Sequence, residues 1–186
     1  SEGLLTLIDR LLSESGVKLK EIEQFAVGVG PGSFTGIRIG CSTLKTFALV
    51  YKKPMIAFSS LKALVLSAAT TQDTASVAVK SAYQGMVFLG WNDLQGAWQE
   101  DAMVFLEWHE NVLKKLLENR SAKEVQYVGS GLDEGTFYSQ HVTAEGMLGA
   151  ISGEQPRPVH EVRARYLRAS QAEIKLNATI AKKSPA

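Results

Sequence analysis

A run of glycines between a strand-like and a helix-like stretch constrains the fold of this chain more than any other feature. Residues 28–40 read GVGPGSFTGIRIG and contain five glycines. The apolar residues Phe25–Val29 predict a short buried strand, and the residues after Gly36 predict a helix that continues to about Tyr51. Because glycine permits positive φ and a close approach of two backbones, the pattern predicts a tight strand–loop–helix connection.

This loop matches none of three familiar phosphate-binding or nucleophile motifs. A Walker A loop ends in Gly-Lys-Ser/Thr, but the first lysine after the loop is Lys45. The dinucleotide fingerprint G-x-G-x-x-G fails at Ser33 or Thr35, and Ser33 stands in the wrong place for a nucleophile elbow. The start of a helix can hold an anion or a partner. The same pattern also suits a plain turn that packs a helix on a strand, so both interpretations stay open.

The rest of the chain predicts an αβαβα order followed by βββαβ, and therefore an α/β fold. The expected helices cover residues 1–15, 37–51, 59–69, 107–119 and 143–151. The expected strands cover residues 25–29, 55–58, 75–80, 86–91, 98–105 and 124–128. Polar residues 70–73 predict a boundary between a first unit, 1–70, and a second unit, 71–186, whose residues 177–186 are expected to fray. The two halves resemble a duplicated ribonuclease-H-like unit, the first copy lacking its opening β-hairpin and third strand.

Residues 1–15 predict an amphipathic helix with a wide apolar face. Six apolar residues recur there at helical spacing: Leu4, Leu5, Leu7, Ile8, Leu11 and Leu12. This face is wider than one contact with a sheet requires, so it predicts a second packing surface. Gly16 is typical of a helix end. Because Ser1 already lies within the helix, we expect a segment in front of it.

Charge and cysteine content narrow the class of protein. The chain has 20 Lys and Arg against 19 Asp and Glu, whereas a strong nucleic-acid binder usually shows a basic excess. The single cysteine, Cys41, excludes an internal disulfide or a multi-cysteine zinc site and suits a reducing compartment. The apolar runs are too short to span a bilayer. These features predict a cytoplasmic protein.

The glycine-rich run and four further segments resemble the TsaB family, also called YeaZ. Residues 30–40 are similar to the signature of that family. The other similarities are Ser1-Glu2 with Leu4-Leu5 and Ile8-Asp9 for "HSE-x-LLP-x-ID", Phe25–Gly28 for the strand before the signature, Ser59-Ser60-Leu61 for "SSLEAL", and Tyr166-Leu167-Arg168 for "YLR". The resemblance is strong over residues 1–70 and thin afterwards.

The resemblance implies an actin-like (ASKHA) pair of ribonuclease-H-like domains and a role in tRNA modification. It implies a non-catalytic subunit, without cofactor or metal, for threonylcarbamoylation of the adenosine beside the anticodon. Its partners would be the catalytic paralogue TsaD, the ATPase TsaE in a larger complex, or a second copy as a homodimer, with tRNA contacted indirectly. The implied partner-binding loop is Gly30, Pro31, Gly32, Ser33, Phe34, Thr35, Gly36 and Arg38. The implied interface helix presents Leu4, Leu5, Ile8, Leu11 and Leu12.

Three departures from the family pattern bear on these expectations. The first strands, with their Asp-Thr-Ser phosphate loop, are absent, so we predict no autonomous ATP site. Lys80 and Ala82 replace the Asp and Arg of an Ala-x-Asp-Ala-Arg segment, and Ala164 replaces a proline. The second half is therefore divergent. The alternative hypothesis is an ATP-binding enzyme of the sugar-kinase, actin and hydrolase (ASKHA) kind, or a glycoprotease-like hydrolase.

Other residue groups give weaker signals. His109, His141 and His160 are too widely spaced for a helical metal motif. Ser42 and Lys45 match S-x-x-K without its partner motifs, so a solvated helix face is expected. We expect Cys41 to pack as a small hydrophobe. The four arginines at 157, 163, 165 and 168 favour a solvated face or a protein interface over a tRNA contact.

Overall fold

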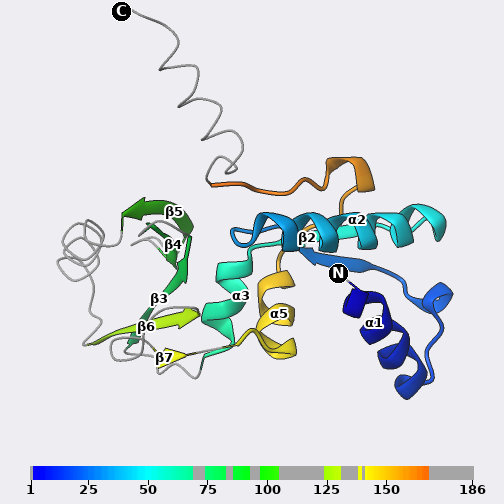
Figure 1. Cartoon of the computed structure of the whole chain (residues 1–186), viewed down its shortest axis with the longest axis horizontal. Helices are drawn as coiled ribbons and strands as arrows, with labels where there is room; N and C mark the ends of the chain where they lie inside the picture. Colours follow the sequence, from blue (N-terminus) through cyan, green and yellow to red (C-terminus); the bar gives the residue numbers. More distant parts are fainter. Residues whose placement is uncertain are drawn as a thin grey trace, which may run out of the picture.

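The computed structural model describes residues 2–68, 74–82, 86–92, 97–104, 124–130, 138–139 and 141–167. Within these ranges the chain forms two β-sheets with helices packed around the first sheet (Figure 1). The predicted helix at 107–119, the boundary residues 70–73, Arg168 and the predicted tail lie outside the described residues. The division into units 1–70 and 71–186 stays a prediction.

The first sheet consists of two short parallel strands, β1 and β2, joined through a helix. The elements of this part are α1 (Glu2–Ser15), η1 (Leu19–Glu21), β1 (Phe25–Gly28), α2 (Phe34–Val50), β2 (Met55–Phe58) and α3 (Ser60–Leu66). The register pairs Phe25 with Met55 and Gly28 with Phe58. Residues 59–69 were expected to be helical, but α3 ends at Leu66, where Ser67 caps it. No third strand among the described residues joins this sheet.

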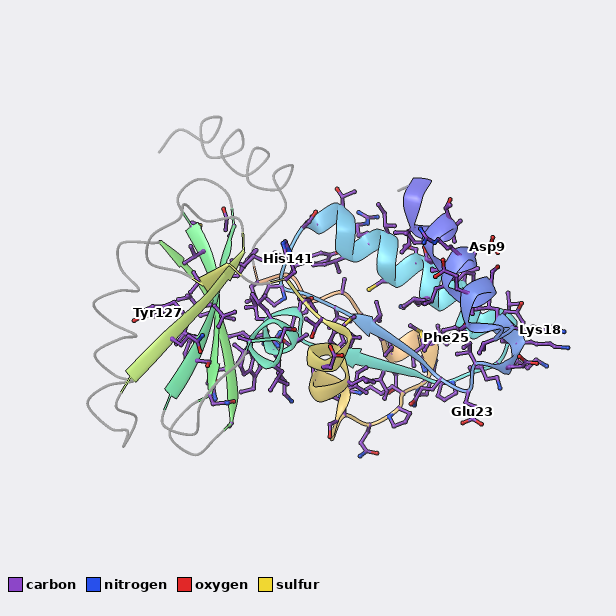
Figure 2. All side chains as sticks on the ribbon, turned by 90° about the horizontal axis from the view of Figure 1, so that it is seen from below. Asp9, Lys18, Glu23, Phe25, Tyr127 and His141 are labelled. Atoms are coloured by element: carbon purple, nitrogen blue, oxygen red, sulfur yellow. The ribbon has the colours of Figure 1, made fainter. Side chains whose placement is uncertain are left out.

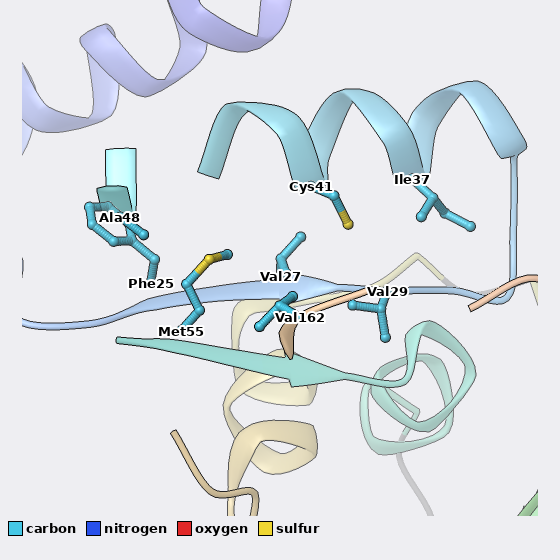
Figure 3. Packing of buried hydrophobic residues seen from close by; sticks show 8 residues of the cluster. All are labelled: Phe25, Val27, Val29, Ile37, Cys41, Ala48, Met55 and Val162. Atoms are coloured by element: carbon cyan, nitrogen blue, oxygen red, sulfur yellow. The ribbon is translucent and has the colours of Figure 1, made fainter. Parts of the chain in front are cut away.

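The core of this part lies between the sheet and α2. Ile37, Cys41 and Ala48 are the buried residues of α2, and they face strand residues such as Val27 (Figure 3). Val162, from near the end of the described chain, completes the same cluster. The recurrence of apolar residues along α2 therefore creates a buried face, as its sequence predicts.

The second sheet has five strands in the order β5-β4-β3-β6-β7. Its strands are β3 (Thr74–Ser81), β4 (Met86–Asn92), β5 (Trp98–Val104), β6 (Glu124–Ser130) and β7 (Tyr138–Ser139). Strands β3, β4 and β5 are antiparallel neighbours, while β6 pairs in parallel with β3 and with β7. The predicted three antiparallel strands are thus confirmed, and β7 is an addition that the sequence pattern did not predict.

Residues 141–167, which we call the return segment, pack against the first sheet although they follow the second sheet in the chain. Helix α5 (Ala144–Ile151) contacts α3 and β2, and Ser67 Oγ accepts a 2.9 Å hydrogen bond from the backbone of Thr143. Arg157 then pairs with the edge of β2 at Met55 in antiparallel fashion. A short helix, η2 (Val159–Glu161), follows in a region where the sequence pattern predicts no element.

Helix α1 stands apart from these layers, on the opposite side of the molecule from the second sheet (Figure 1). Figure 2 shows the same separation, with Asp9 of α1 and Tyr127 of β6 at opposite ends. The helix ends at Ser15 as predicted, but its residues 3–15 include none that is buried. In the described part of the chain, no helix is long and apolar enough to cross a membrane.

Candidate binding site at the glycine-rich loop

The loop between β1 and α2 turns the chain sharply and starts the helix. Gly30 has a φ of +113°, a conformation that residues with a Cβ rarely adopt, and a cis peptide bond joins it to Pro31. Ser33 is the N-cap of α2, and its Oγ accepts a 3.2 Å hydrogen bond from the backbone N–H of Gly36. The loop is therefore held at both ends by ordinary backbone and capping interactions.

The return segment lies directly on this loop. The backbone N–H of Arg165 donates a 2.8 Å hydrogen bond to the carbonyl of Val29. A Cβ on Gly30 would be only 2.6 Å from the carbonyl oxygen of Arg165. Phe34 stacks on Tyr166, with ring centroids 4.6 Å apart and planes 27° from parallel. Glycine at position 30 is thus required because two backbones meet there, which explains part of the signature sequence without any ligand.

A cavity of about 440 Å³ opens beside this junction. Its wall includes Gly30 in the loop after β1, Phe58 on β2 and Trp98 on β5, so both sheets contribute to it. Charged side chains from α3 and the return segment also line it: Lys62, Glu154, Arg157, Glu161, Arg163 and Arg165. This size suits a small-molecule or single-residue ligand.

A buried carboxylate links the two sheets at the wall of the cavity. The side chain of Glu100 on β5 is 0% exposed, and its Oε1 accepts hydrogen bonds from Trp98 Nε1 at 2.7 Å and from Ser59 Oγ. Its Oε2 lies 2.8 Å from Arg165 Nη1, close enough for an ion pair although the geometry is not that of an aligned hydrogen bond. Ser59 also caps α3 by accepting from the backbone of Lys62. Glu100 therefore joins the second sheet to α3 and to the return segment.

A lysine of the second sheet faces the opposite part of the loop. A Cβ on Gly32 would be 3.2 Å from Lys80 Nζ. Burial lowers the pKa of Lys80, because removing an ammonium group from water disfavours its charged form. The second sheet thus places the amino group of Lys80 against the glycine-rich loop.

The loop residues selected from the sequence do not converge on one site. Gly30 lines the cavity, Gly32 faces Lys80, and Phe34 contacts Tyr166. Arg38 Cζ lies 5.3 Å from the centroid of the Phe34 ring. Pro31 is fully buried, whereas Thr35 and Gly36 are exposed at the first turn of α2. The loop is thus a junction with different neighbours on each side.

The selected residues of α1 form a separate surface. Leu5 is 57% exposed and Leu11 is 65% exposed, while Leu4, Ile8 and Leu12 are half-buried. Leu49 and Val50, at the C-terminal end of α2, are also exposed. Several large apolar side chains this exposed on one helix are typical of a surface that packs against another molecule.

Groups that would support catalysis were also located. Cys41 is buried, and burial raises the pKa of its thiol, with nearby Lys45 opposing part of that effect. Among the described residues no cluster of His, Cys, Asp and Glu could hold a metal ion. His109 lies outside the described residues, whereas His160 is exposed and 3.9 Å from Glu161.

Sequence reasoning missed Glu100, Trp98 and Ser59 as one cluster. Ser59 was considered only as a helix cap, and a single Glu in an antiparallel strand gives no periodic signal. The arginines were expected on a solvated face or protein interface. Arg157, Arg163 and Arg165 are exposed, but all three line the cavity and Arg165 pairs with Glu100.

Comparison with solved structures first defines the class of fold. A structure from Pseudomonas aeruginosa described as an uncharacterized protein with similarity to peptidase YEAZ matches with a TM-score of 0.64 and 22% identity, covering 90% of this chain and 84% of the other. The structure of YeaZ from Pseudomonas aeruginosa matches with a TM-score of 0.61 and 22% identity, covering 87% and 82%. The chain therefore has a YeaZ-like α/β fold.

Sequence comparison then identifies the family. The family model described as "TsaD: tRNA N6-adenosine threonylcarbamoyltransferase" matches residues 1–103, more than half of the chain. This chain belongs to that family of tRNA threonylcarbamoyladenosine modification proteins, in which TsaB (YeaZ) proteins are also found.

Some individual relatives are named as the transferase, and others are named TsaB. A tRNA N6-adenosine threonylcarbamoyltransferase of Methylorubrum extorquens is 45% identical over 74 residues, which are 40% of this chain and 21% of the relative. The TsaB protein of Escherichia coli is 38% identical over 68 residues, which are 37% of this chain and 29% of the relative. The matched part thus spans less than a third of these curated relatives.

Proposed function

We propose that this chain is a non-catalytic scaffold subunit in tRNA threonylcarbamoyladenosine formation and that it binds the catalytic paralogue TsaD. The apolar face of α1 carries this proposal, because Leu5, Leu7 and Leu11 are exposed on a helix whose residues 3–15 include none that is buried. Covering the exposed parts of Leu5, Leu7 and Leu11 would contribute roughly 3–6 kcal/mol to docking. The TsaB signature in the loop and the YeaZ-like fold support the same function.

In this proposal the glycine-rich loop sets the position of α2 and of the return segment, and docking helps to form or hold the active site of TsaD. Arg38 adds a polar contact at the rim of the proposed docking surface. The ATPase TsaE joins the larger complex, and the protein acts in the cytoplasm.

We further propose that β1 and β2 are part of a ribonuclease-H-like sheet whose opening hairpin and third strand are absent from this sequence. Residues 1–70 and 71–186 would then be the two units of an actin-like pair. The return segment would belong to the second unit by its position in the sequence. It would nevertheless pack against the first unit, through α5 and Arg157.

Size exclusion with light scattering tests the scaffold function. The chain is measured alone and mixed with TsaD of the same organism, as wild type and as the double variant Leu5→Ser/Leu11→Ser. We expect a one-to-one complex for the wild type and a loss of at least tenfold in affinity for the double variant. Ser13→Ala, a substitution on the polar face of the same helix, is the matched control and should bind as the wild type does. If the double variant Leu5→Ser/Leu11→Ser binds undiminished, α1 is not part of the interface.

The relatives that carry the TsaD name favour a second candidate, in which the chain is itself part of a threonylcarbamoyl transferase. A transfer assay with tRNA, using the chain without any partner, separates the two. Transfer by the chain alone would establish the enzyme, whereas transfer only after addition of TsaD supports the scaffold. A wild type that forms homodimers and ignores TsaD would contradict the scaffold.

A further inference from the structure

We propose that Glu100 is a positioning residue for the glycine-rich loop. Its two carboxylate oxygens hold the two chain segments that contact the start of that loop. Glu100 lies on β5 in the second sheet, whereas the loop follows β1 in the first sheet. The inference rests on the proposed function, in which this loop sets the position of α2 for docking on TsaD. A side chain of the second sheet thus controls the docking geometry of the first.

The first connection runs from Oε1 of Glu100 through the end of β2. Ser59, which directly follows β2, donates its hydroxyl proton to Oε1 and accepts a 3.0 Å hydrogen bond from the backbone N–H of Lys62. The backbone N–H of the next residue, Ser60, donates a 2.9 Å hydrogen bond to the carbonyl of Gly30. Because Ser59 and Ser60 are adjacent, the bond that fixes the Ser59 hydroxyl also restrains the peptide that contacts the loop.

The second connection runs from Oε2 of Glu100 through the return segment. Arg165 Nη1 lies 2.8 Å from Oε2, and the backbone N–H of Arg165 donates a 2.8 Å hydrogen bond to the carbonyl of Val29. The carbonyl oxygen of Arg165 lies 2.6 Å from the position of a Cβ on Gly30. The two connections therefore reach the loop at consecutive residues, Val29 and Gly30, and both start from one carboxylate.

Burial makes the charge of Glu100 depend on Arg165. The side chain of Glu100 is 0% exposed, and its Oε2 accepts no aligned hydrogen bond within the described part of the chain. The side chain of Arg165 is 52% exposed, so its guanidinium could return to water if the pair broke. A buried charge that loses its partner destabilises the folded state strongly. The ion pair therefore favours the arrangement in which Arg165, and the backbone attached to it, stays on the loop.

The same segment contacts the start of α2. Tyr166 directly follows Arg165 and stacks on Phe34, the first residue of α2. The guanidinium carbon of Arg38, on the same helix, lies 5.3 Å from the centroid of the Phe34 ring. Release of Arg165 from Glu100 is therefore expected to loosen the contact between Tyr166 and Phe34, and with it the part of α2 that carries Arg38.

Hydrogen exchange of single amides, measured by NMR on the whole chain, tests this role. Glu100→Gln keeps the size of the side chain and an acceptor oxygen but removes the negative charge. We expect the Arg165 amide, which bonds to Val29, to exchange at least about tenfold faster in this variant. The Arg157 amide bonds to Met55 at 2.8 Å from the same return segment, and it serves as the internal control that should not change.

A control variant and a second substitution separate the ion pair from a general loss of stability. Asp101→Asn removes an exposed carboxylate from the same strand and should leave both amides protected. Arg165→Met should lower the urea midpoint more than Glu100→Gln does, because it leaves a buried charge without its cation. The double variant Glu100→Gln/Arg165→Met should regain part of that loss, since the two positions are in direct contact.

Binding to TsaD connects the role of Glu100 to docking. We expect Glu100→Gln to weaken the complex about fivefold or more, and Asp101→Asn to bind as the wild type does. Undiminished binding by a Glu100→Gln chain whose Arg165 amide exchanges rapidly would overturn the inference, because the position of the loop would then not matter for docking.

Three further results would also overturn it: unchanged exchange of the Arg165 amide in Glu100→Gln, equal acceleration of the Arg165 and Arg157 amides, or a urea midpoint of Arg165→Met no lower than that of Glu100→Gln. A wild type that does not bind TsaD would refute the proposed scaffold function. The exchange and unfolding results would then still decide whether Glu100 positions the loop, so the two failures are distinguishable.

Discussion

Helices α1 and α2 have similar apolar sequences but different surroundings. Helix α2 buries Ile37, Cys41 and Ala48 against the first sheet, whereas Leu5, Leu7 and Leu11 of α1 remain exposed. An apolar face on a helix is therefore not sufficient to identify a core element. In this chain the same apolar pattern forms a core contact in α2 and, in our account, a docking surface in α1. Substitutions in the two helices should therefore differ in their effect on stability.

The largest expected difference in the free energy of unfolding is between substitutions at Gly30, which precedes α2, and at Gly16, which follows α1. Gly30→Ala should lower the free energy of unfolding by about 3–5 kcal/mol, since it combines backbone strain with a clash against Arg165 and Ile37. Gly16→Ala should lower the free energy of unfolding by only about 1 kcal/mol. Gly16 also has a positive φ, which strains an alanine, but no atom lies within 4 Å of its Cβ position, so no clash is added. Urea unfolding measures both, and equal losses would show that the return segment does not press on the loop.

Truncation of one side chain in each helix gives the next largest effect. Ile37→Ala should lower the free energy of unfolding by about 2–4 kcal/mol, because it leaves a cavity in the core beneath α2. Leu11→Ala should change it by less than about 0.5 kcal/mol, because that side chain is mostly in water already. Thermal and urea unfolding check the pair. A large loss for Leu11→Ala in the isolated chain would mean that α1 belongs to the core.

Thiol reactivity gives the smallest and most local test. Cys41 on α2 should react with a disulfide reagent at least tenfold more slowly at pH 8 than the cysteine of a Leu11→Cys/Cys41→Ala variant. Burial raises the pKa of Cys41, so its folded state favours the neutral thiol and its reactivity should still be rising above pH 9. The same pKa shift means that the contribution of the thiol to stability is lost as pH rises from the unfolded pKa through the folded one. Equal rates for the two thiols would contradict the difference in burial.

Much of the fold followed from local sequence patterns. The strand–loop–helix unit around residues 28–40 was predictable, because apolar periodicity and glycines act over a few residues. The three antiparallel strands were predictable for the same reason. The return of residues 141–167 to the first sheet was not, because contacts such as Arg157 with Met55 join residues about a hundred positions apart and leave no periodic trace.

The candidate site was predicted only in part. The sequence identified Gly30 but not the reason for it, which is the carbonyl of Arg165. The Glu100 cluster depends on three elements that meet only after folding. The leucines of α1 were selected as interface residues through a family resemblance. Their exposure is consistent with that function, which stays a prediction until a partner is bound.

Hydrogen–deuterium exchange of the α1 amides tests the central claim most directly. The chain is measured alone and in the presence of saturating TsaD of the same organism. Our account predicts that α1 exchanges rapidly in the free chain, while α2 is protected, and that TsaD slows exchange in α1 at least tenfold. Protection of α1 in the free monomer, or unchanged exchange in α1 within a formed complex, would contradict the claim that this helix is a docking surface.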